Sequence, residues 1–385
     1  MKYFDYAATT PPYPEVVRVM SDMMQQHYGN PSSLHRYGEE ADRLLRRARE
    51  VSAGILGVQP QELIFTSGAT ESNNLAIKGA AMRRGRMQGH IVTTSIEHAS
   101  VYESCRQLEQ IGFDVSYVNP EPDGTVSLER IQQAFRPDTI LFSMMHVNNE
   151  TGAIQLVEAA ARWIRQHYPR AVIHVDGVQA FGKIAALPLH TGIIDLYSLS
   201  AHKLRGPRGT GLLYARQGTE LFPLLAGGGQ EQGYRSGTEH VAGIAGMTKA
   251  LRLAAERQPQ QQQHWSAQSD ELRSHIADIP GLVLTDVTYP APHIVHFTYP
   301  GMKAEVVLHS LEQQGYLVST QSACSSRRAQ PSRVLLSMGM NPEQATGGIR
   351  ISLGDEHTAQ DIQQLAAALK QVVTALRPLE RRSIQ

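Results

Sequence analysis

Two ionisable residues, Asp176 and Lys203, each follow an apolar run of the kind that forms a buried strand. Asp176 ends the run "AVIHVD", and Lys203 comes three residues after "DLYSLS". A charged group is costly to bury unless it is paired or well hydrogen-bonded. A lysine amine can form an imine with an aldehyde, and a carboxylate can pair with a protonated ring nitrogen. The two residues therefore indicate a ligand that carries both an aldehyde and a basic ring nitrogen.

Further polar residues stand at the ends of other apolar runs. After "ELIFT" comes "SGATES", in which Ala69 and Thr70 open a helix whose free N–H groups and dipole favour a phosphate. Taken alone, this segment is explained equally well by helix capping. The remaining polar residues in such positions are His98, Asn149, Gln179, Ser200 and His202.

Together these groups match pyridoxal 5'-phosphate. Lys203 would bind its aldehyde, and Asp176 would keep its ring nitrogen protonated, which makes the ring an electron sink. Thr70, Ser200 and His202 would hold the phosphate, while His98 would stack on the ring. Each residue alone could have a purely structural role. Five strand ends that supply complementary groups are better explained by one shared ligand than by five unrelated structural roles.

Alternating periodicities indicate the elements that must position these residues. Segments with helical spacing, such as "EEADRLLRRAREVSAGILG", are followed by short apolar runs rich in β-branched residues, such as "HIVTTS". This alternation predicts an α/β fold with a mostly parallel central sheet flanked by helices. Ligands of such a sheet lie beyond the carboxyl ends of its strands, where the polar residues stand. After residue 253 the pattern shifts through "PQQQQHW" to shorter strands and helices, which predicts a smaller α+β domain.

Composition and charge narrow the class of protein. The chain has 385 residues, of which 41% are hydrophobic and 19% charged, enough to bury a large core. Lys+Arg and Asp+Glu both number 36, so no net field favours nucleic acid or an anionic membrane as the main partner. No signal-peptide core or membrane-spanning run is evident, and we expect a cytoplasmic protein.

The two cysteines are far apart in the sequence and differ in their surroundings. Cys105 and Cys324 form no CxxC pair, so neither a disulfide framework nor a zinc site is indicated. Cys105 lies in "SVYESCRQLEQIG", which reads as an amphipathic helix, and is expected to be an inert core residue. Cys324 lies in "STQSACSSRR", whose small polar residues predict an exposed, mobile loop, where a thiol can react.

Motifs along nearly the whole chain resemble those of the cysteine desulfurases, in the class V aminotransferase group of fold-type I pyridoxal-phosphate enzymes. They include "DYAATTP", "FTSGATESNNLAIKG", "HVDGVQAFGK", "SAHKLRGPRGTGLLY", "RSGTEH", "SACSS" and "IRISLG", in the order that is usual for the family. The resemblance implies conversion of L-cysteine to L-alanine, with the sulfur left as a persulfide on an enzyme cysteine.

The resemblance also assigns roles to individual residues. Lys203 would be the cofactor-binding lysine, Asp176 the partner of the ring nitrogen, and Gln179 the partner of the ring oxygen. The phosphate would be bound by Ala69, Thr70, Ser200 and His202, and by Thr238 of a neighbouring subunit. Asn149 would contact cofactor and substrate, and Arg350 would bind the substrate carboxylate, which its planar fork suits. Lys203, Cys324 and His98 would be catalytic, with Cys324 accepting the sulfur.

The same resemblance predicts domains and partners. A large cofactor domain would span residues 12–253, and a small domain would combine residues 1–11 and 254–385 and carry the cysteine loop at about residues 319–331. The expected assembly is a homodimer. A sulfur-acceptor protein of iron–sulfur cluster assembly or tRNA thiolation is expected as partner, without direct nucleic-acid or membrane contact.

Some positions depart from the family pattern. Gln321 stands where glycine is usual in "STQSAC", Gly177 stands where alanine is common after the aspartate, and Asp355 follows "SLG" where arginine is frequent. The sequence also ends at "LERRSIQ", without the longer tail that some relatives use to dock scaffold proteins. The identity of the sulfur acceptor is therefore left open.

Two other classes of function are compatible with parts of the sequence. One is another class V enzyme, either an aminotransferase in which Cys324 is incidental or a selenocysteine lyase. The other is a non-catalytic scaffold of the same fold, although such a protein would have no need to keep Lys203, Asp176 and Cys324 together.

Overall fold

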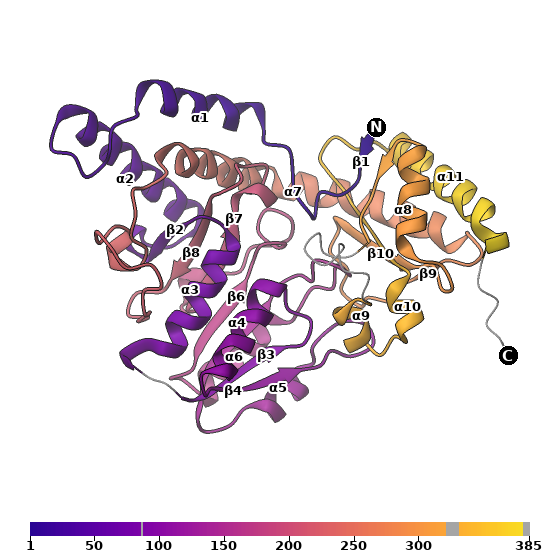
Figure 1. Ribbon diagram of the computed structural model, residues 1–385, viewed down its shortest axis with the longest axis horizontal. Coiled ribbons are helices and arrows are strands. Elements are labelled where there is room, and N and C mark those ends of the chain that lie inside the picture. The colour runs from indigo at the N-terminus through magenta and orange to yellow at the C-terminus, as the bar shows by residue number, and fades with distance from the viewer. Residues whose placement is uncertain (86–87, 321–330, 380–385) are drawn as a thin grey trace.

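The computed structural model describes residues 1–85, 88–320 and 331–379, which form an α/β fold (Figure 1). Among these residues seven strands form the main sheet, in the order β2-β8-β7-β6-β5-β3-β4. All of them run in one direction except β8, which is antiparallel to both of its neighbours. The predicted mostly parallel sheet is thus confirmed.

The strands of this main sheet are short and buried. Every residue of β3, β6 and β7 is buried, as expected for strands that are covered on both faces. The bounds of the strands are β2 (Leu63–Thr66), β3 (His90–Thr94), β4 (Asp114–Val118), β5 (Thr139–Met145), β6 (Val172–Asp176), β7 (Leu196–Ser200) and β8 (Gly211–Ala215).

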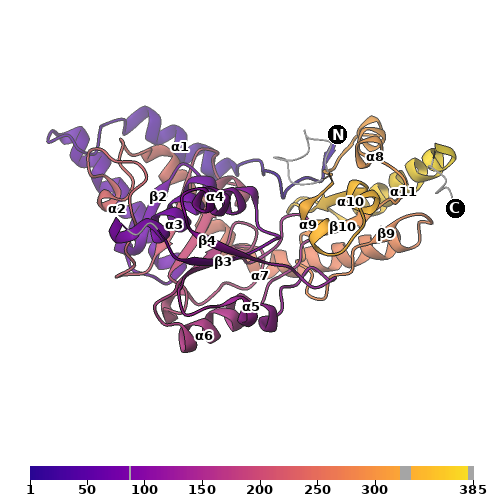
Figure 2. The ribbon, with the colours of Figure 1, turned by 60° about the horizontal axis from the view of Figure 1, so that its bottom comes forward.

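Helices cover both faces of the main sheet (Figure 2). On one face α3 and α4 pack over a core that contains Leu75, Val101 and Leu213. On the other face α6 and the first part of α7 pack over a second core, which contains Ile164, Ile173 and Met247. The helices in this half of the chain are α1 (Pro14–Gln26), α2 (Arg36–Leu56), α3 (Ala69–Met82), α4 (Ala99–Gln110), α5 (Leu128–Ala134), α6 (Val157–His167) and α7 (Val241–Ala277).

A third core lies beside the main sheet and joins the first residues of the chain to its C-terminal part. Phe4, Trp265, Phe297 and Ile351 belong to it. Its strands are β1 (Lys2–Tyr3) and β11 (Tyr316–Leu317), which are parallel, and the antiparallel β9 (Val283–Leu284), β10 (Ile294–Thr298) and β12 (Gly348–Ser352). The helices around it are α8 (Ala304–Gln313), α9 (Arg333–Ser337), α10 (Pro342–Thr346) and α11 (Ala359–Leu376).

Helix α7 contributes to two of these cores. Met247 and Leu251 pack beneath the main sheet, whereas Trp265 and Leu272 pack in the third core. The helix continues through Pro259, and the glutamine run that follows it is helical. The predicted domain boundary between residues 253 and 254 falls inside α7, and the division into domains stays a prediction. No helix in the described part of the chain is both long enough and apolar enough to cross a bilayer.

His174 lies at the centre of the main sheet and is fully buried. Its two ring nitrogens lie 2.8 Å from Ser143 Oγ and 3.0 Å from Ser198 Oγ, on the neighbouring strands β5 and β7. Burial lowers the pKa of this ring to about 3. The folded chain therefore keeps His174 neutral over a pH range in which an unfolded chain protonates it, at an ordinary pKa of about 6.5.

This difference makes the stability of the fold depend on pH. Below about pH 6.5 the unfolded chain binds the extra proton, so the free energy of unfolding falls as the pH falls, by about 1.4 kcal/mol per pH unit for each such group. We expect His174→Gln, whose amide can still bond both serines, to lose free energy of unfolding less steeply between about pH 6 and pH 4.5. Urea denaturation across that range measures the slope. The matched control is His309→Gln, the same substitution at an exposed position on α8. Equal slopes for His174→Gln and the wild type would contradict the conclusion that the buried His174 stays neutral in the folded chain.

Candidate functional site

A cavity of about 470 Å³ opens at the edge of the main sheet where the parallel strands end. This is where open α/β sheets bind ligands, because the turns that follow the strands converge there. The walls come from those turns, from the N-terminal segment and from β12. Ten of the predicted site residues line it, namely Ala69, Thr70, His98, Asn149, Asp176, Gln179, Ser200, His202, Lys203 and Arg350.

Lys203 ends a short 3₁₀ turn (Ala201–Lys203) that follows β7. Its Nζ donates hydrogen bonds to Ala7 O at 2.6 Å and to Ala8 O at 2.7 Å. Ala7 O also accepts a hydrogen bond from Gln179 Nε2 at 2.9 Å. Backbone carbonyls of the N-terminal segment therefore hold both the lysine and the glutamine at the cavity.

Asp176 is the last residue of β6, and only 5% of its surface is exposed. Its carboxylate accepts hydrogen bonds from Asn73 Nδ2 at 2.8 Å and from Val178 N at 3.0 Å. Among the described residues, however, it forms no ion pair. A buried carboxylate that is hydrogen-bonded but not paired with a cation suits a ligand that brings positive charge.

His98 precedes α4 and caps its first turn. Its Nδ1 accepts from Ser100 N at 3.2 Å and lies 2.8 Å from Ser100 Oγ, which in turn accepts from Asn73 Nδ2 at 2.9 Å. Burial lowers the pKa of His98, and this effect outweighs the opposing charge of Asp176. The ring is therefore neutral near pH 7, and because Nδ1 accepts the backbone bond, its proton is on Nε2.

The first turn of α3 and the turn after β7 frame the part of the cavity that is suited to an anion. Ala69 and Thr70 begin α3, whose first N–H groups have no partner inside the helix. A Cβ at position 211 would lie 2.5 Å from the Gly68 carbonyl carbon, so only glycine lets β8 pass this close to the turn. His202 lines the same cavity, and burial lowers its pKa to about 3, which keeps its ring neutral.

Arg350 lies on β12 and is almost completely buried, with 1% of its surface exposed. Its guanidinium donates to Asn149 O at 2.6 Å and pairs with Asp5 Oδ1 at 2.7 Å. Its Nε has no hydrogen-bond partner among the described residues. The arginine is thus anchored from two sides at the cavity wall, and these two contacts use only two of its five N–H groups.

Of the two remaining predicted residues, the structure describes Thr238 but not Cys324. Thr238 is exposed and does not line the cavity of its own chain. Cys324 and the nearby Gln321, Arg327 and Arg328 lie outside the described residues. Cys105 is buried in α4, where burial raises the pKa of its thiol, in agreement with an inert core residue.

The described residues on either side of positions 321–330 are anchored at the cavity. Ser319 exchanges two backbone hydrogen bonds with Arg350, at 3.1 and 2.8 Å. Ser332 Oγ donates to the Glu150 carboxylate at 2.5 Å, and Arg333 donates to the carbonyls of Ser95 and Glu97, directly before His98. Ser319 therefore lies beside Arg350, and Arg333 lies beside the turn that carries His98.

Sequence reasoning missed several residues of the site. Asn73 bridges Asp176 and Ser100, and its position one turn into the helix that begins at Ala69 is a signal that could have pointed to it. Ala7 and Ala8 act through backbone carbonyls, which no side-chain pattern reveals. Asp5 acts as the partner of Arg350 across 345 residues of sequence.

Comparisons with known proteins give the same picture. The sequence model of the family Aminotransferase class-V matches residues 2–365. The chain is 40% identical to the cysteine desulfurase IscS of Vibrio vulnificus over 383 residues, which cover 98% of this chain and 94% of the relative.

Solved structures are similarly close. A NifS-like protein has a TM-score of 0.91 and 36% identity, with 97% of this chain and 99% of that chain covered. A structure described as SspA in complex with cysteine has a TM-score of 0.80 and 36% identity, with 92% of this chain and 99% of that chain covered. Since this similarity extends over nearly the full length of the chain, the protein belongs to the class V aminotransferase family and, within it, to the pyridoxal-phosphate-dependent cysteine desulfurases.

Proposed function

We propose that this enzyme converts L-cysteine to L-alanine and keeps the sulfur as a persulfide on Cys324. In the balanced reaction the Cβ–S bond of the substrate breaks, an S–S bond forms at Cys324, and the carbon that loses sulfur gains a hydrogen. The observation that carries the proposal is the convergence of Lys203, Asp176, His98 and Arg350 on one cavity. This geometry supports an enzyme that acts on an amino acid rather than a scaffold.

The residues of the cavity fit pyridoxal phosphate. Asp176 lacks a cationic partner among the described residues and would pair with the protonated ring nitrogen. Gln179 would bond the ring oxygen, and His98 would stack on the ring. Asn149, on the cavity wall, would contact both cofactor and substrate. When bound, the cofactor supplies an electron sink for the electrons that are released at the substrate Cα.

The phosphate of the cofactor would occupy the anion-suited part of the cavity. Ala69 and Thr70 would donate from the first turn of α3, and Ser200 and His202, also in the cavity wall, would bond the same phosphate. Both histidines of the cavity are neutral near pH 7, so the helix terminus and hydrogen bonds rather than histidine charge would hold the anion. Thr238 of a second subunit would complete this set.

Proton transfer in the reaction is assigned to Lys203 and His98. The Lys203 amine would remove the hydrogen from the substrate Cα, and the Ala7 and Ala8 carbonyls would orient it and stabilise its protonated form. His98, neutral with its proton on Nε2, would pass a proton between the substrate thiol and Cys324. Each residue thus holds a proton at a defined atom.

Arg350 would bind the substrate carboxylate and orient the substrate. It lines the cavity, and its contacts with Asp5 and Asn149 O fix the plane of the guanidinium. Because Ser319 is hydrogen-bonded to the backbone of Arg350, the chain just before position 321 lies next to the proposed substrate site. This placement supports Cys324 as the sulfur acceptor.

The proposal extends to partners and location. The persulfide would be passed to an acceptor protein, either an iron–sulfur scaffold or a tRNA-thiolation enzyme. A homodimer would place Thr238 at the cavity of the second subunit, and the balanced charge of the chain fits a cytoplasmic protein.

The first test is replacement of the proposed sulfur acceptor. The cofactor-loaded wild type should release alanine from L-cysteine, and mass spectrometry should find one added sulfur on Cys324. In Cys324→Ala alanine release should fall to near background, because the sulfur then has no acceptor. The matched control is Cys105→Ala, the other cysteine of the chain, which should retain the wild-type rate. Alanine release by Cys324→Ala at the wild-type rate would instead favour an aminotransferase or another lyase of this family.

The second test removes the charge at the ring nitrogen. Asp176→Asn keeps the shape of the side chain but cannot hold the ring nitrogen protonated, so kcat for alanine release should fall by roughly 100-fold. Steady-state kinetics of the loaded enzyme measure the change. Asp361→Asn alters a carboxylate of similar burial at the start of α11, away from the cavity, and should leave kcat unchanged. A normal kcat in Asp176→Asn would remove the proposed role of this residue.

A further inference from the structure

Arg205 lies two residues after Lys203 and has an unusual backbone conformation. Its φ of +60° falls in the left-handed region, which side chains other than glycine seldom adopt. Such a conformation persists only where the surrounding contacts hold it. The contacts of Arg205 therefore bear directly on the turn that carries Lys203.

The first set of contacts joins Arg205 to the N-terminal segment. Its backbone N donates to Thr10 Oγ1 at 2.9 Å, and its Nε donates to Pro11 O at 3.1 Å. The guanidinium lies 4.6 Å from the centre of the Tyr13 ring, and Tyr13 N donates to Arg205 O at 3.0 Å. Thr10 in turn donates twice to His202 O, so the lysine turn and residues 10–13 form one hydrogen-bonded unit.

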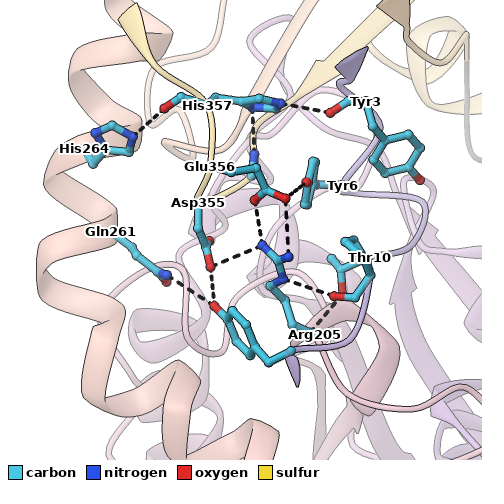
Figure 3. Close-up of polar contacts among 12 residues, drawn as sticks. Tyr3, Tyr6, Thr10, Arg205, Gln261, His264, Asp355, Glu356 and His357 are labelled. Carbon is cyan, nitrogen blue, oxygen red and sulfur yellow. Dashed lines mark hydrogen bonds and ion pairs between the residues drawn. The ribbon is translucent and has the colours of Figure 1, made fainter. Parts of the chain in front are cut away.

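The second set joins Arg205 to the turn that follows β12 (Figure 3). The guanidinium lies 2.7 and 3.3 Å from the two carboxylate oxygens of Glu356 and 3.5 Å from Asp355 Oδ2. The hydroxyls of Tyr6 and Tyr13 donate to Glu356 and Asp355 respectively. Only 15% of the Arg205 side chain and 21% of the Asp355 side chain are exposed, which reduces the screening of that pair by water, whereas half of the Glu356 side chain is exposed.

The same turn is tied to the N-terminal segment and to the substrate-binding wall. His357 Nδ1 accepts from Gly354 N at 3.0 Å, and His357 Nε2 lies 2.9 Å from Tyr3 O. Five residues before Asp355, Arg350 pairs with Asp5. Residues 5–8 are thus held between β12, which carries Arg350, and the turn that carries Lys203.

We propose that Arg205 is a positioning residue for the reaction. This proposal rests on the function proposed above. Its pairs with Asp355 and Glu356 clamp the N-terminal segment in place, so that the Ala7 and Ala8 carbonyls orient Lys203 while Asp5 orients Arg350. The clamp explains why an aspartate stands at position 355, where the family pattern frequently has arginine. An arginine at position 355 would face Arg205 and repel it.

The test compares three variants with the wild type. Arg205→Met removes the charge and keeps the bulk, Arg205→Lys keeps the charge without the planar fork, and Asp355→Arg places two cations together. The matched control is Arg165→Met, which breaks a similarly buried pair with Asp195 at the opposite end of β7. Two quantities are measured: hydrogen exchange of backbone amides in the cofactor-free chain, and kcat and KM for L-cysteine in the loaded enzyme.

The clamp predicts a local effect. In Arg205→Met and Asp355→Arg, the amides of Thr10 and Tyr13 should exchange about tenfold faster or more, while amides of the main sheet keep their wild-type rates. KM for L-cysteine should rise about tenfold or more, and by a larger factor than kcat falls, because Arg350 loses its alignment. In Arg205→Lys, KM should rise less than in Arg205→Met. Arg165→Met should change neither the exchange of Thr10 and Tyr13 nor KM.

Two results would overturn the proposal. One is wild-type exchange at Thr10 and Tyr13 together with a wild-type KM in Arg205→Met. The other is faster exchange throughout the chain with no selective rise in KM, which would mark Arg205 as an ordinary stabilising residue. Because exchange is measured without cofactor, the clamp is tested even if the wild type makes no alanine, a result that would contradict the proposed function instead.

Discussion

The burial of the Asp176 carboxylate is the constraint on which the site depends. A carboxylate at the end of a central strand loses its hydration, and hydrogen bonds from Asn73 and Val178 replace only part of it. Asn73 lies on the buried, sheet-facing side of α3, together with apolar residues such as Leu75 and Ile77. The same amide also bonds Ser100, whose hydroxyl orients His98. One buried charge thus links two helices on the same face of the sheet to the end of β6.

A second constraint is that the site is assembled from segments that are far apart in the sequence. Carbonyls of residues 7 and 8 meet Lys203 and Gln179, and Asp5 meets Arg350. The N-terminal segment therefore forms part of the cavity wall. Its backbone polar groups are satisfied by residues of the site itself, which couples the order of this segment to the order of the site.

Much of the fold and of the site could be predicted from the sequence, because the alternation of buried strands and amphipathic helices is strong. Polar residues such as His98, Asp176 and Lys203 stand directly after such strands, and the rule that parallel strands end at one edge brings them together. Backbone groups such as Ala7 O carry no side-chain signature. Pairs such as Arg205 with Glu356 depend on the packing of distant segments, which local patterns do not encode. The left-handed backbone at Arg205 is equally invisible, since arginine is not a residue that predicts it.

Helix α7 has a consequence for how the chain holds together mechanically. Its first part is buried through Ile244 and Leu251 against the main sheet, and its last part through Leu272 and Ile276 in the neighbouring core. A fragment that ended at the composition shift after residue 253 would contain only the first part of α7. Apolar surface would then be exposed in both cores. One continuous helix therefore connects the core beneath the main sheet to the third core, and its backbone hydrogen bonds run from one core to the other.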